Sequence, residues 1–269
     1  MNYYIIIGSA RSGTTFVHKL LASHPEVSAL SDEVNADAEF FDKGIKIFTY
    51  GNEKPSENKQ GFRRIIETLC ELNKSKETKA CGIKIALHYP DQAEKVVTKL
   101  KDYMPHIKVI IVKRKDLVAQ YGSFLRAKIT GLVHNDFSTK TNIKVKNFCI
   151  SKYWFKIYLR NHLKMNKIID QIKETNECLE LSYENDIEKY GSGVNARIFD
   201  FLGITHVNKV YLQKKVSPAA PEYIVNYETL KKIQASFEQN KDFENKKFRR
   251  PLFNYYLLYK ILIKRILQL

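Results

Sequence analysis

The sequence of 269 residues has few cysteines and no apolar run long enough for a polytopic membrane protein. Its four cysteines are too few for a disulfide scaffold, and no two of them are spaced like the ligands of a zinc site. We therefore expect reduced thiols, no bound metal and a cytoplasmic protein. The cysteines are Cys70, Cys81, Cys149 and Cys178.

Carboxylates are also scarce: 29 Asp and Glu face 45 Lys and Arg, so the formal net charge is +16. Such a surface attracts nucleic acids, anionic lipids, acidic polysaccharides or phosphorylated small molecules. Residues 137–169 contain no carboxylate and mix lysines with aromatic residues. A nucleic-acid surface or an amphipathic helix would each explain this segment. No zinc-finger, RNP or GxxG motif accompanies it, so we favour the helix and expect no nucleic acid as partner.

Apolar segments of strand type alternate with segments of helical type. The β-branched and aromatic run at residues 3–7 ends at a glycine and precedes an expected helix at 14–23. Further strands are expected at 82–87, 107–112 and 178–182, with helices of ten or more residues between them. One of these helices is expected to begin at Asp116 as its N-cap and to run to about Thr130, and another is expected over roughly 146–175. This alternation predicts an α/β fold with a central parallel sheet flanked by helices on both faces.

One α/β domain is expected over residues 1–250, followed by a basic amphipathic helix at 251–269. The final segment contains Lys260, Lys264 and Arg265, too many charges for a spanning helix. Two interpretations stay open. The helix either lies on the inner face of a membrane as a peripheral contact, or packs on its own domain or on a second subunit of a homodimer.

The segment Gly8–Thr15, GSARSGTT, lies between the first expected strand and helix. This is the position of a phosphate-binding loop, where backbone N–H groups and a helix N-terminus face an anion. The G-x4-G frame matches Walker A except that Thr14 replaces the lysine. Triphosphate hydrolysis is therefore disfavoured, whereas a phosphate ligand in a P-loop-like nucleotide-binding fold is not. Arg11 supplies a cation upstream of the usual position.

Four motifs resemble sulfotransferases that use 3′-phosphoadenosine 5′-phosphosulfate (PAPS). The first is RSGTTF at residues 11–16, and the second is IVKRKD at 111–116 with Ser123 nine residues after its arginine. LELSYE at 179–184 and PEYIVNYETL at 221–230 follow in family order. The second motif is closest to bacterial carbohydrate sulfotransferases of the trehalose-sulfotransferase type.

The resemblance implies a PAPS site without metal. In the family, the loop binds the 5′-phosphosulfate, and an arginine and a serine in the second motif bind the 3′-phosphate. Lys214 and Lys215 precede a proline in a loop that either closes over the nucleotide or is simply solvated. The implied donor ligands are Arg11, Ser12, Gly13, Thr14, Thr15, Arg114, Ser123, Lys214 and Lys215.

Two residues are candidates for the general base that sulfuryl transfer to a hydroxyl requires. Glu33 lies where the resembling enzymes place a carboxylate facing the acceptor, with Asp32 as a neighbouring competitor. His88 follows the strand expected at 82–87 and is the second candidate. Lys84 lies inside that apolar strand, so it either faces a cleft or lies at the surface of an edge strand.

The sequence thus predicts in-line transfer of a sulfuryl group from PAPS to a hydroxyl of a carbohydrate or glycolipid. Arg11 would stabilise charge on the departing phosphate, and PAPS and its product would be the nucleotide ligands. Two alternatives belong to other classes: a P-loop kinase-like protein that binds a nucleoside triphosphate, and a basic nucleic-acid-binding protein.

Overall fold

The computed structural model describes residues 1–29, 34–35, 77–130, 147–189, 192–207 and 220–239. The chain divides into two compact units, and we describe each by itself. The first comprises Met1–Lys115 and Asn161–Lys214, and the second comprises Asp116–Arg160 and Lys215–Leu269. The helix expected at 251–269 lies outside the described residues, and the single domain over 1–250 stays a prediction.

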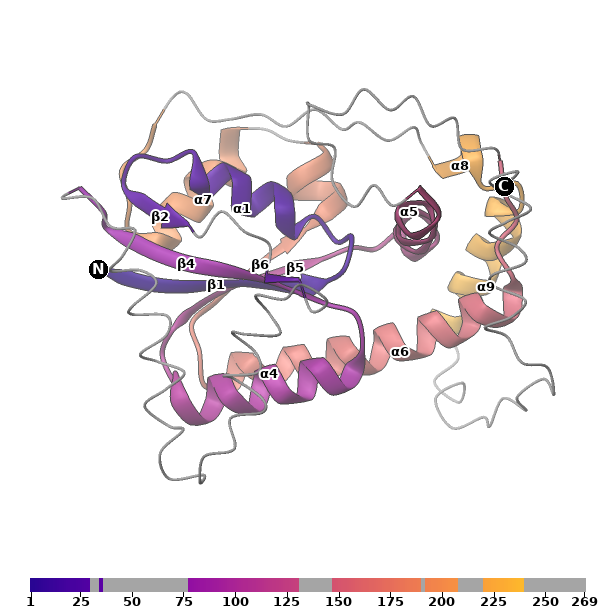
Figure 1. Cartoon of the computed structure of the whole chain (residues 1–269), viewed down its shortest axis with the longest axis horizontal. Helices are drawn as coiled ribbons and strands as arrows, with labels where there is room; N and C mark the ends of the chain where they lie inside the picture. Colours follow the sequence, from indigo (N-terminus) through magenta and orange to yellow (C-terminus); the bar gives the residue numbers. More distant parts are fainter. Residues whose placement is uncertain (30–33, 36–76, 131–146, 190–191, 208–219, 240–269) are drawn as a thin grey trace. The chain divides into compact units, whose positions relative to one another are not determined.

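The first unit is built on a six-stranded sheet in which every described pairing is parallel. The strand order is β2-β4-β1-β5-β6, and β3 pairs with β4 beyond the end of β2. β1 therefore lies at the centre of the sheet, between β4 and β5 (Figure 1). The strands are β1 (Asn2–Ser9), β2 (Val27–Ala29), β3 (Val34–Asn35), β4 (Ala80–Leu87), β5 (Lys108–Lys113) and β6 (Cys178–Ser182).

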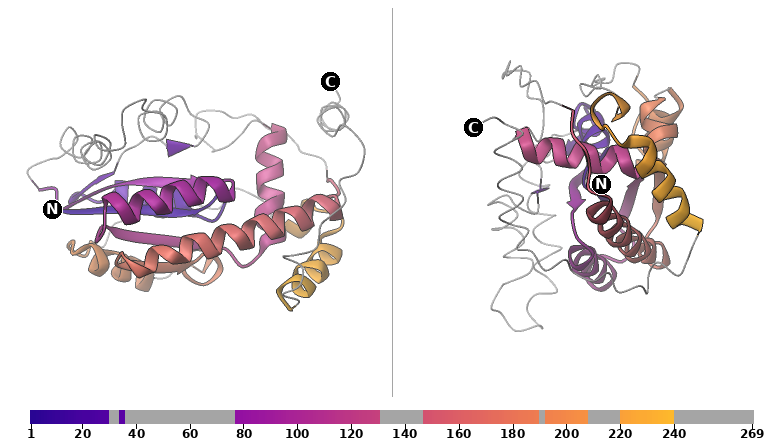
Figure 2. Two further views of the ribbon diagram at one scale, coloured as in Figure 1. Left: turned by 90° about the horizontal axis from the view of Figure 1, so that it is seen from below. Right: turned by 90° about the vertical axis from the view of Figure 1, so that its right-hand side faces the viewer.

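Helices cover both faces of this sheet, because its central strands are apolar on both sides. Ile5 and Ile7 face a core that includes residues of α4 (Pro90–Tyr103) and the C-terminal half of α6 (Lys152–Asp170). Tyr4 and Ile6 face the opposite core, formed with α1 and α7 (Figure 1, Figure 2). The α/β fold with helices on both faces, expected from the sequence, is confirmed. The bounds of the last two helices are Thr14–Ala22 for α1 and Ser192–Leu202 for α7.

Two short irregular elements follow α6 in the first unit. A 3-10 turn, η1 (Gln171–Glu174), leads into β6, and a π-helical turn, η2 (Tyr183–Glu188), follows that strand directly. The η2 turn is held at its start by Asp186, whose Oδ2 accepts the N–H of Ser182 at 2.6 Å. The position of η2 beside the carboxyl end of β6 matters for the site described below.

The second unit contains α5 (Leu117–Thr130), α8 (Ala220–Tyr223), α9 (Tyr227–Gln239) and the first half of α6. Asp116 caps α5, as its sequence predicts, because its Oδ1 accepts the N–H of Ala119 at 3.0 Å. The helix expected from residue 146 begins only at Lys152. Phe148 instead forms an isolated bridge with Ile224, and residues 147–151 are not helical.

The disulfide state differs from the expectation of four reduced thiols. Cys149 and Cys178 are free, and burial is the main cause that raises the pKa of the Cys178 thiol to about 11. Cys81, buried on β4, is disulfide-bonded, so the expectation is wrong for this residue. Sequence spacing could not show this, because a disulfide joins residues that only the fold brings together.

A buried histidine on α6 predicts acid sensitivity of the fold. His162 is almost fully buried beside Asn166, and burial, with the charge of Lys113, lowers its pKa to about 4. Below pH 6.5 the unfolded chain binds a proton that the folded chain rejects, so stability falls as the pH falls toward 4. The loss approaches about 1.4 kcal/mol per pH unit in this window.

The change that tests this expectation is His162→Gln, which keeps a hydrogen-bonding partner for Asn166 but cannot titrate. Urea unfolding between pH 4.5 and 6.5 should show a shallower loss of stability for this variant than for the parent chain. His206→Gln is the control, because His206 is exposed and pairs with Asp200. Equal slopes for His162→Gln and the parent would contradict the assignment.

Candidate nucleotide-binding site

The loop Gly8–Thr15 joins the carboxyl end of the central strand β1 to α1. Neighbouring strands hold its first half: the N–H of Ala10 donates to the carbonyl of Leu87 at 2.7 Å. Gly8 approaches β5 so closely that a Cβ there would lie 2.5 Å from the carbonyl oxygen of Val112. The chain then turns through left-handed conformations at Arg11 (φ 65°) and Gly13 (φ 106°), which aims the loop back over the helix N-terminus.

This turn leaves hydrogen-bond donors at the start of α1. The N–H groups of Gly13 and Thr14 have no acceptor among the described residues, and neither has the buried hydroxyl of Ser12. No acidic residue lies in the first turn of α1 to compete for these donors. Free donors at the positive end of a helix dipole are an arrangement that suits an anion.

A buried lysine lies beside the same loop. Lys84, on β4, is 1% exposed, and its Nζ donates to the hydroxyl of Thr15 at 3.0 Å. β4 pairs with β1 on one side and with β2 and β3 on the other, so it is an interior strand. The alternative that Lys84 lies at the surface of an edge strand is therefore wrong. An ammonium in this position adds positive charge beside the loop.

The two arginines predicted to bind the nucleotide meet here. Arg114 follows β5, and its Nη1 donates to the carbonyl oxygen of Arg11 at 3.2 Å. Its guanidinium carbon lies 4.2 Å from the ring centroid of Tyr183, and the side chain is 11% exposed. The Nη2 group of Arg114 has no hydrogen-bond partner among the described residues, so no acceptor among them competes with a ligand for it.

Two neighbours of Arg114 were not predicted as site residues. Tyr183 and Glu184 begin the η2 turn, and Glu184 lies with Oε1 3.9 Å from Nε of Arg114. Both belong to the motif LELSYE at residues 179–184, for which no role in the site was predicted. The available signal was its position: a tyrosine and a carboxylate directly follow a parallel strand, at the edge where phosphate loops lie.

The other predicted residues are placed as follows. His88 follows β4 at the same edge of the sheet and is half-buried, with its backbone N–H donating to Gln92 Oε1 at 2.9 Å. Ser123 lies half-buried on α5, in the second unit. Glu33, Lys214 and Lys215 lie outside the described residues, so their predicted roles stay predictions.

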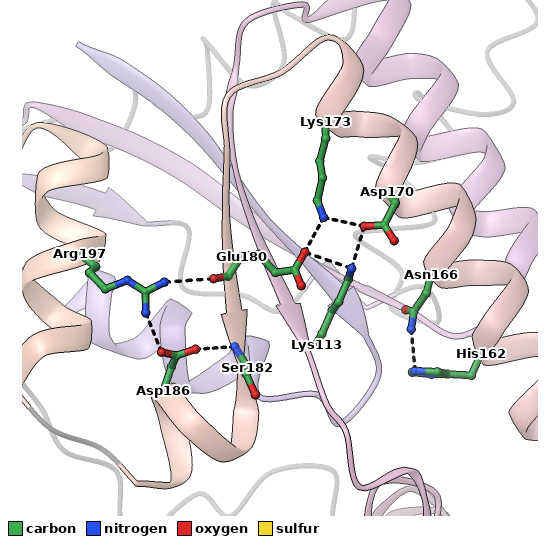
Figure 3. A network of polar contacts seen from close by, with 9 residues as sticks. All are labelled: Lys113, His162, Asn166, Asp170, Lys173, Glu180, Ser182, Asp186 and Arg197. Atoms are coloured by element: carbon green, nitrogen blue, oxygen red, sulfur yellow. Dashed lines mark hydrogen bonds and ion pairs between the residues drawn. The ribbon is translucent and has the colours of Figure 1, made fainter. Parts of the chain in front are cut away.

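A neutral cluster of charges adjoins the site but leaves no net charge for a ligand. Lys113 contacts Asp170 at 2.7 Å and Glu180 at 3.1 Å, and Lys173 contacts the same two carboxylates (Figure 3). Partial burial would raise the pKa of each carboxyl group, but hydrogen bonds from the lysines outweigh it and lower both. The charge of Lys113 is thus compensated within the protein.

The described residues contain no group of three or more His, Cys, Asp and Glu side chains that could hold a metal ion. No helix among them is long and apolar enough to cross a membrane.

The chain matches a family of known proteins. A family model described as "Sulfotransferase family" matches residues 4–208. No curated protein sequence matches the chain.

Similar solved structures include three that are only distantly related in sequence. A sulfotransferase from Alicyclobacillus acidocaldarius is 15% identical, with a TM-score of 0.48, 92% of this chain covered and 97% of that one. The sulfotransferase domain of the Synechococcus PCC 7002 olefin synthase is 14% identical, with a TM-score of 0.49 and coverages of 100% and 95%. A sulfotransferase domain from the curacin biosynthetic pathway is 14% identical, with a TM-score of 0.46 and coverages of 99% and 96%.

Proposed function

The chain belongs to the sulfotransferase family, and from this premise we propose that it transfers a sulfuryl group from PAPS to a hydroxyl of a carbohydrate or glycolipid. The observation that carries the proposal is the loop at the centre of the sheet. There the free N–H groups of Gly13 and Thr14, the Ser12 hydroxyl and the Lys84 ammonium lie at the start of one helix. Such a site suits the 5′-phosphosulfate of the donor.

The loop residues would stabilise the leaving group. In sulfuryl transfer the acceptor oxygen forms a bond to sulfur while the bond from sulfur to the phosphate oxygen breaks, and negative charge grows on that phosphate. The amides of Gly13 and Thr14, the hydroxyl of Thr15 and the side chain of Arg11 would meet this charge with fixed donors. Lys84, which already donates to Thr15, would supply a further cation.

Arg114 and Ser123 would bind the 3′-phosphate. The support for Arg114 is its unengaged Nη2 group and its contact with the backbone of the loop at Arg11. A planar guanidinium suits a phosphate because two N–H groups can donate to it in parallel. Ser123 is proposed on the motif alone, as are Lys214 and Lys215 for the loop over the nucleotide.

Glu33 is our proposed general base, with His88 as the alternative. The acceptor hydroxyl must lose its proton as its oxygen attacks sulfur, so one of these side chains would accept it. Glu33→Gln and His88→Asn separate the two, because only the loss of the true base should lower turnover without weakening nucleotide binding. The acceptor class rests on the resemblance to carbohydrate sulfotransferases, and a membrane-bound glycolipid would suit a peripheral helix at 251–269.

The donor half of the proposal is tested by Arg114→Ala. We expect this variant to bind adenosine 3′,5′-bisphosphate about 30- to 100-fold more weakly, the scale of one charged hydrogen-bonded contact of about 2–3 kcal/mol. Binding of adenosine 5′-monophosphate, which lacks the 3′-phosphate, should hardly change. Isothermal titration calorimetry measures both ligands.

Arg160→Ala is the control, since it removes an exposed arginine on α6 that has no proposed role at the nucleotide. This control should bind both nucleotides as the parent chain does. An equal loss of both nucleotides in Arg114→Ala would contradict a role at the 3′-phosphate.

A further inference from the structure

Glu184 holds the backbone that carries Arg114. Both of its carboxylate oxygens lie within hydrogen-bond distance of the N–H of Lys115, at 3.1 and 3.0 Å. Its Oε1 is also 3.9 Å from Nε of Arg114. One carboxylate therefore contacts the peptide directly after Arg114 and the base of the guanidinium fork.

Tyr183 contacts the other two parts of the site. Its ring lies under the guanidinium of Arg114, at 4.2 Å from the guanidinium carbon to the ring centroid. The same ring packs against the phosphate loop, where a Cβ on Gly13 would lie 2.8 Å from Tyr183 Cδ2. The ring thus contacts both the loop and the guanidinium, and its face stabilises the cation.

We propose that Tyr183 and Glu184 are positioning residues that set the orientation of Arg114 and thereby the selectivity for a 3′-phosphorylated nucleotide. This inference rests on the proposed function, in which Arg114 binds the 3′-phosphate. It adds that affinity for this phosphate depends on a carboxylate that never touches the nucleotide.

The orientation follows from counting the donors of the guanidinium. Nη1 donates to the carbonyl of Arg11, and Nε is buried at an ion-pair distance of 3.9 Å from Glu184 without a hydrogen bond among the described residues. The tyrosine ring occupies one face. The Nη2 edge remains for a phosphate, and its direction is set because the other groups are fixed. A free arginine side chain would lose rotamer entropy on binding, and this arrangement has already lost most of it.

Glu184 also has an opposing effect, because its negative charge weakens the attraction of Arg114 for an anion. This charge lies 3.9 Å from Nε and not beside the Nη2 group proposed for the phosphate, and the distance to the anion reduces the effect. The two contacts with Lys115 N–H are shorter and act on the backbone. We therefore expect positioning to outweigh charge, so that removal of Glu184 weakens binding.

The turn itself does not depend on Glu184. Asp186 accepts the N–H of Ser182 at 2.6 Å and the Nη1 of Arg197 at 2.7 Å, which fixes the start of η2 independently. Ile187 is buried in the core of the unit and anchors the end of the turn. A substitution at Glu184 can therefore affect Arg114 without unfolding the segment.

The test measures binding of adenosine 3′,5′-bisphosphate and adenosine 5′-monophosphate to Glu184→Ala, Glu184→Gln and the parent chain by calorimetry. Glu184→Ala should bind the bisphosphate at least tenfold more weakly and the monophosphate within twofold of the parent. Glu184→Gln keeps one oxygen acceptor for Lys115 and should recover part of the loss. Glu180→Gln is the matched control, because this carboxylate lies on the preceding strand and pairs with Lys113 and Lys173.

A double-mutant cycle supplies a readout that a merely structural role would not move. In an Arg114→Ala background, Glu184→Ala should change bisphosphate binding less than twofold, because its effect passes through the arginine. Equal losses for both nucleotides, additive losses in the cycle, or tighter binding by Glu184→Ala would overturn the inference. A parent chain that binds the bisphosphate no better than the monophosphate would instead overturn the proposed function.

Discussion

Replacing Gly13 by alanine should weaken binding of adenosine 3′,5′-bisphosphate by two orders of magnitude or more. Gly13 has φ 106°, a conformation that strains any residue with a Cβ by about 1–3 kcal/mol. The added carbon would also lie 2.8 Å from Tyr183 and 3.0 Å from Ile187, so the loop or the ring must move. Either movement displaces the N–H groups of Gly13 and Thr14 from the anion site.

A second left-handed glycine provides the control for this variant. Gly203 has φ 65°, and a Cβ there would meet only the amide of Asn2, at 3.3 Å. Gly203→Ala should lower the thermal unfolding midpoint but leave bisphosphate affinity within about twofold, since it lies away from the loop. Adenosine 3′-monophosphate, which lacks the 5′-phosphate, should distinguish the two parts of the site. Its binding should fall far less than that of the bisphosphate in Gly13→Ala, and equal losses would contradict a local effect.

Replacing Lys84 by methionine should lower sulfuryl transfer about 100- to 1,000-fold, the scale for losing one fixed electrostatic group at a reacting centre. Methionine retains the buried aliphatic stem, so the unfolding midpoint should stay within a few degrees of the parent value. The effect should concentrate on the 5′-phosphate end of the nucleotide, because Lys84 donates to Thr15 of the loop. The loss in binding should therefore be larger for the bisphosphate than for adenosine 3′-monophosphate.

Lys108→Met is the matched control for this experiment. Lys108 lies on β5, which β1 separates from β4, and contacts the carbonyl of Phe201 and the carboxylate of Glu177. Its loss should reduce stability slightly and leave nucleotide binding unchanged. Turnover of the donor with water as acceptor provides a rate while the natural acceptor is being sought. A Lys84→Met chain that turns over at the parent rate would exclude Lys84 from the proposed chemistry.

Local patterns in the sequence predicted most of the first unit correctly. The parallel sheet follows from apolar runs such as residues 3–7 and 107–112, and the tight connection from β1 to α1 follows from the glycine spacing at Gly8 and Gly13. These features depend on residues close together in the chain. The helical start predicted at residue 146 was wrong because Phe148 pairs with Ile224, a contact between distant segments that no local pattern encodes.

The same limit explains what was missed at the site. The approach of Tyr183 and Glu184 to Arg114 depends on the pairing of β5 with β6, which puts their carboxyl ends side by side. The burial of Lys84 depends on β4 being an interior strand, which strand order alone decides. Residue type and spacing identified both segments, whereas their roles required the order of strands in the sheet.

The central claim is that the loop binds a nucleotide carrying phosphates at the 5′ and 3′ positions without a metal ion. Calorimetric titration of adenosine 3′,5′-bisphosphate in the presence of EDTA, beside ATP with and without Mg²⁺, tests it most directly. We expect bisphosphate binding that is unchanged by EDTA and tighter than ATP binding in either condition. ATP binding that requires Mg²⁺, with no response to the bisphosphate, would contradict the account and favour a kinase-like protein.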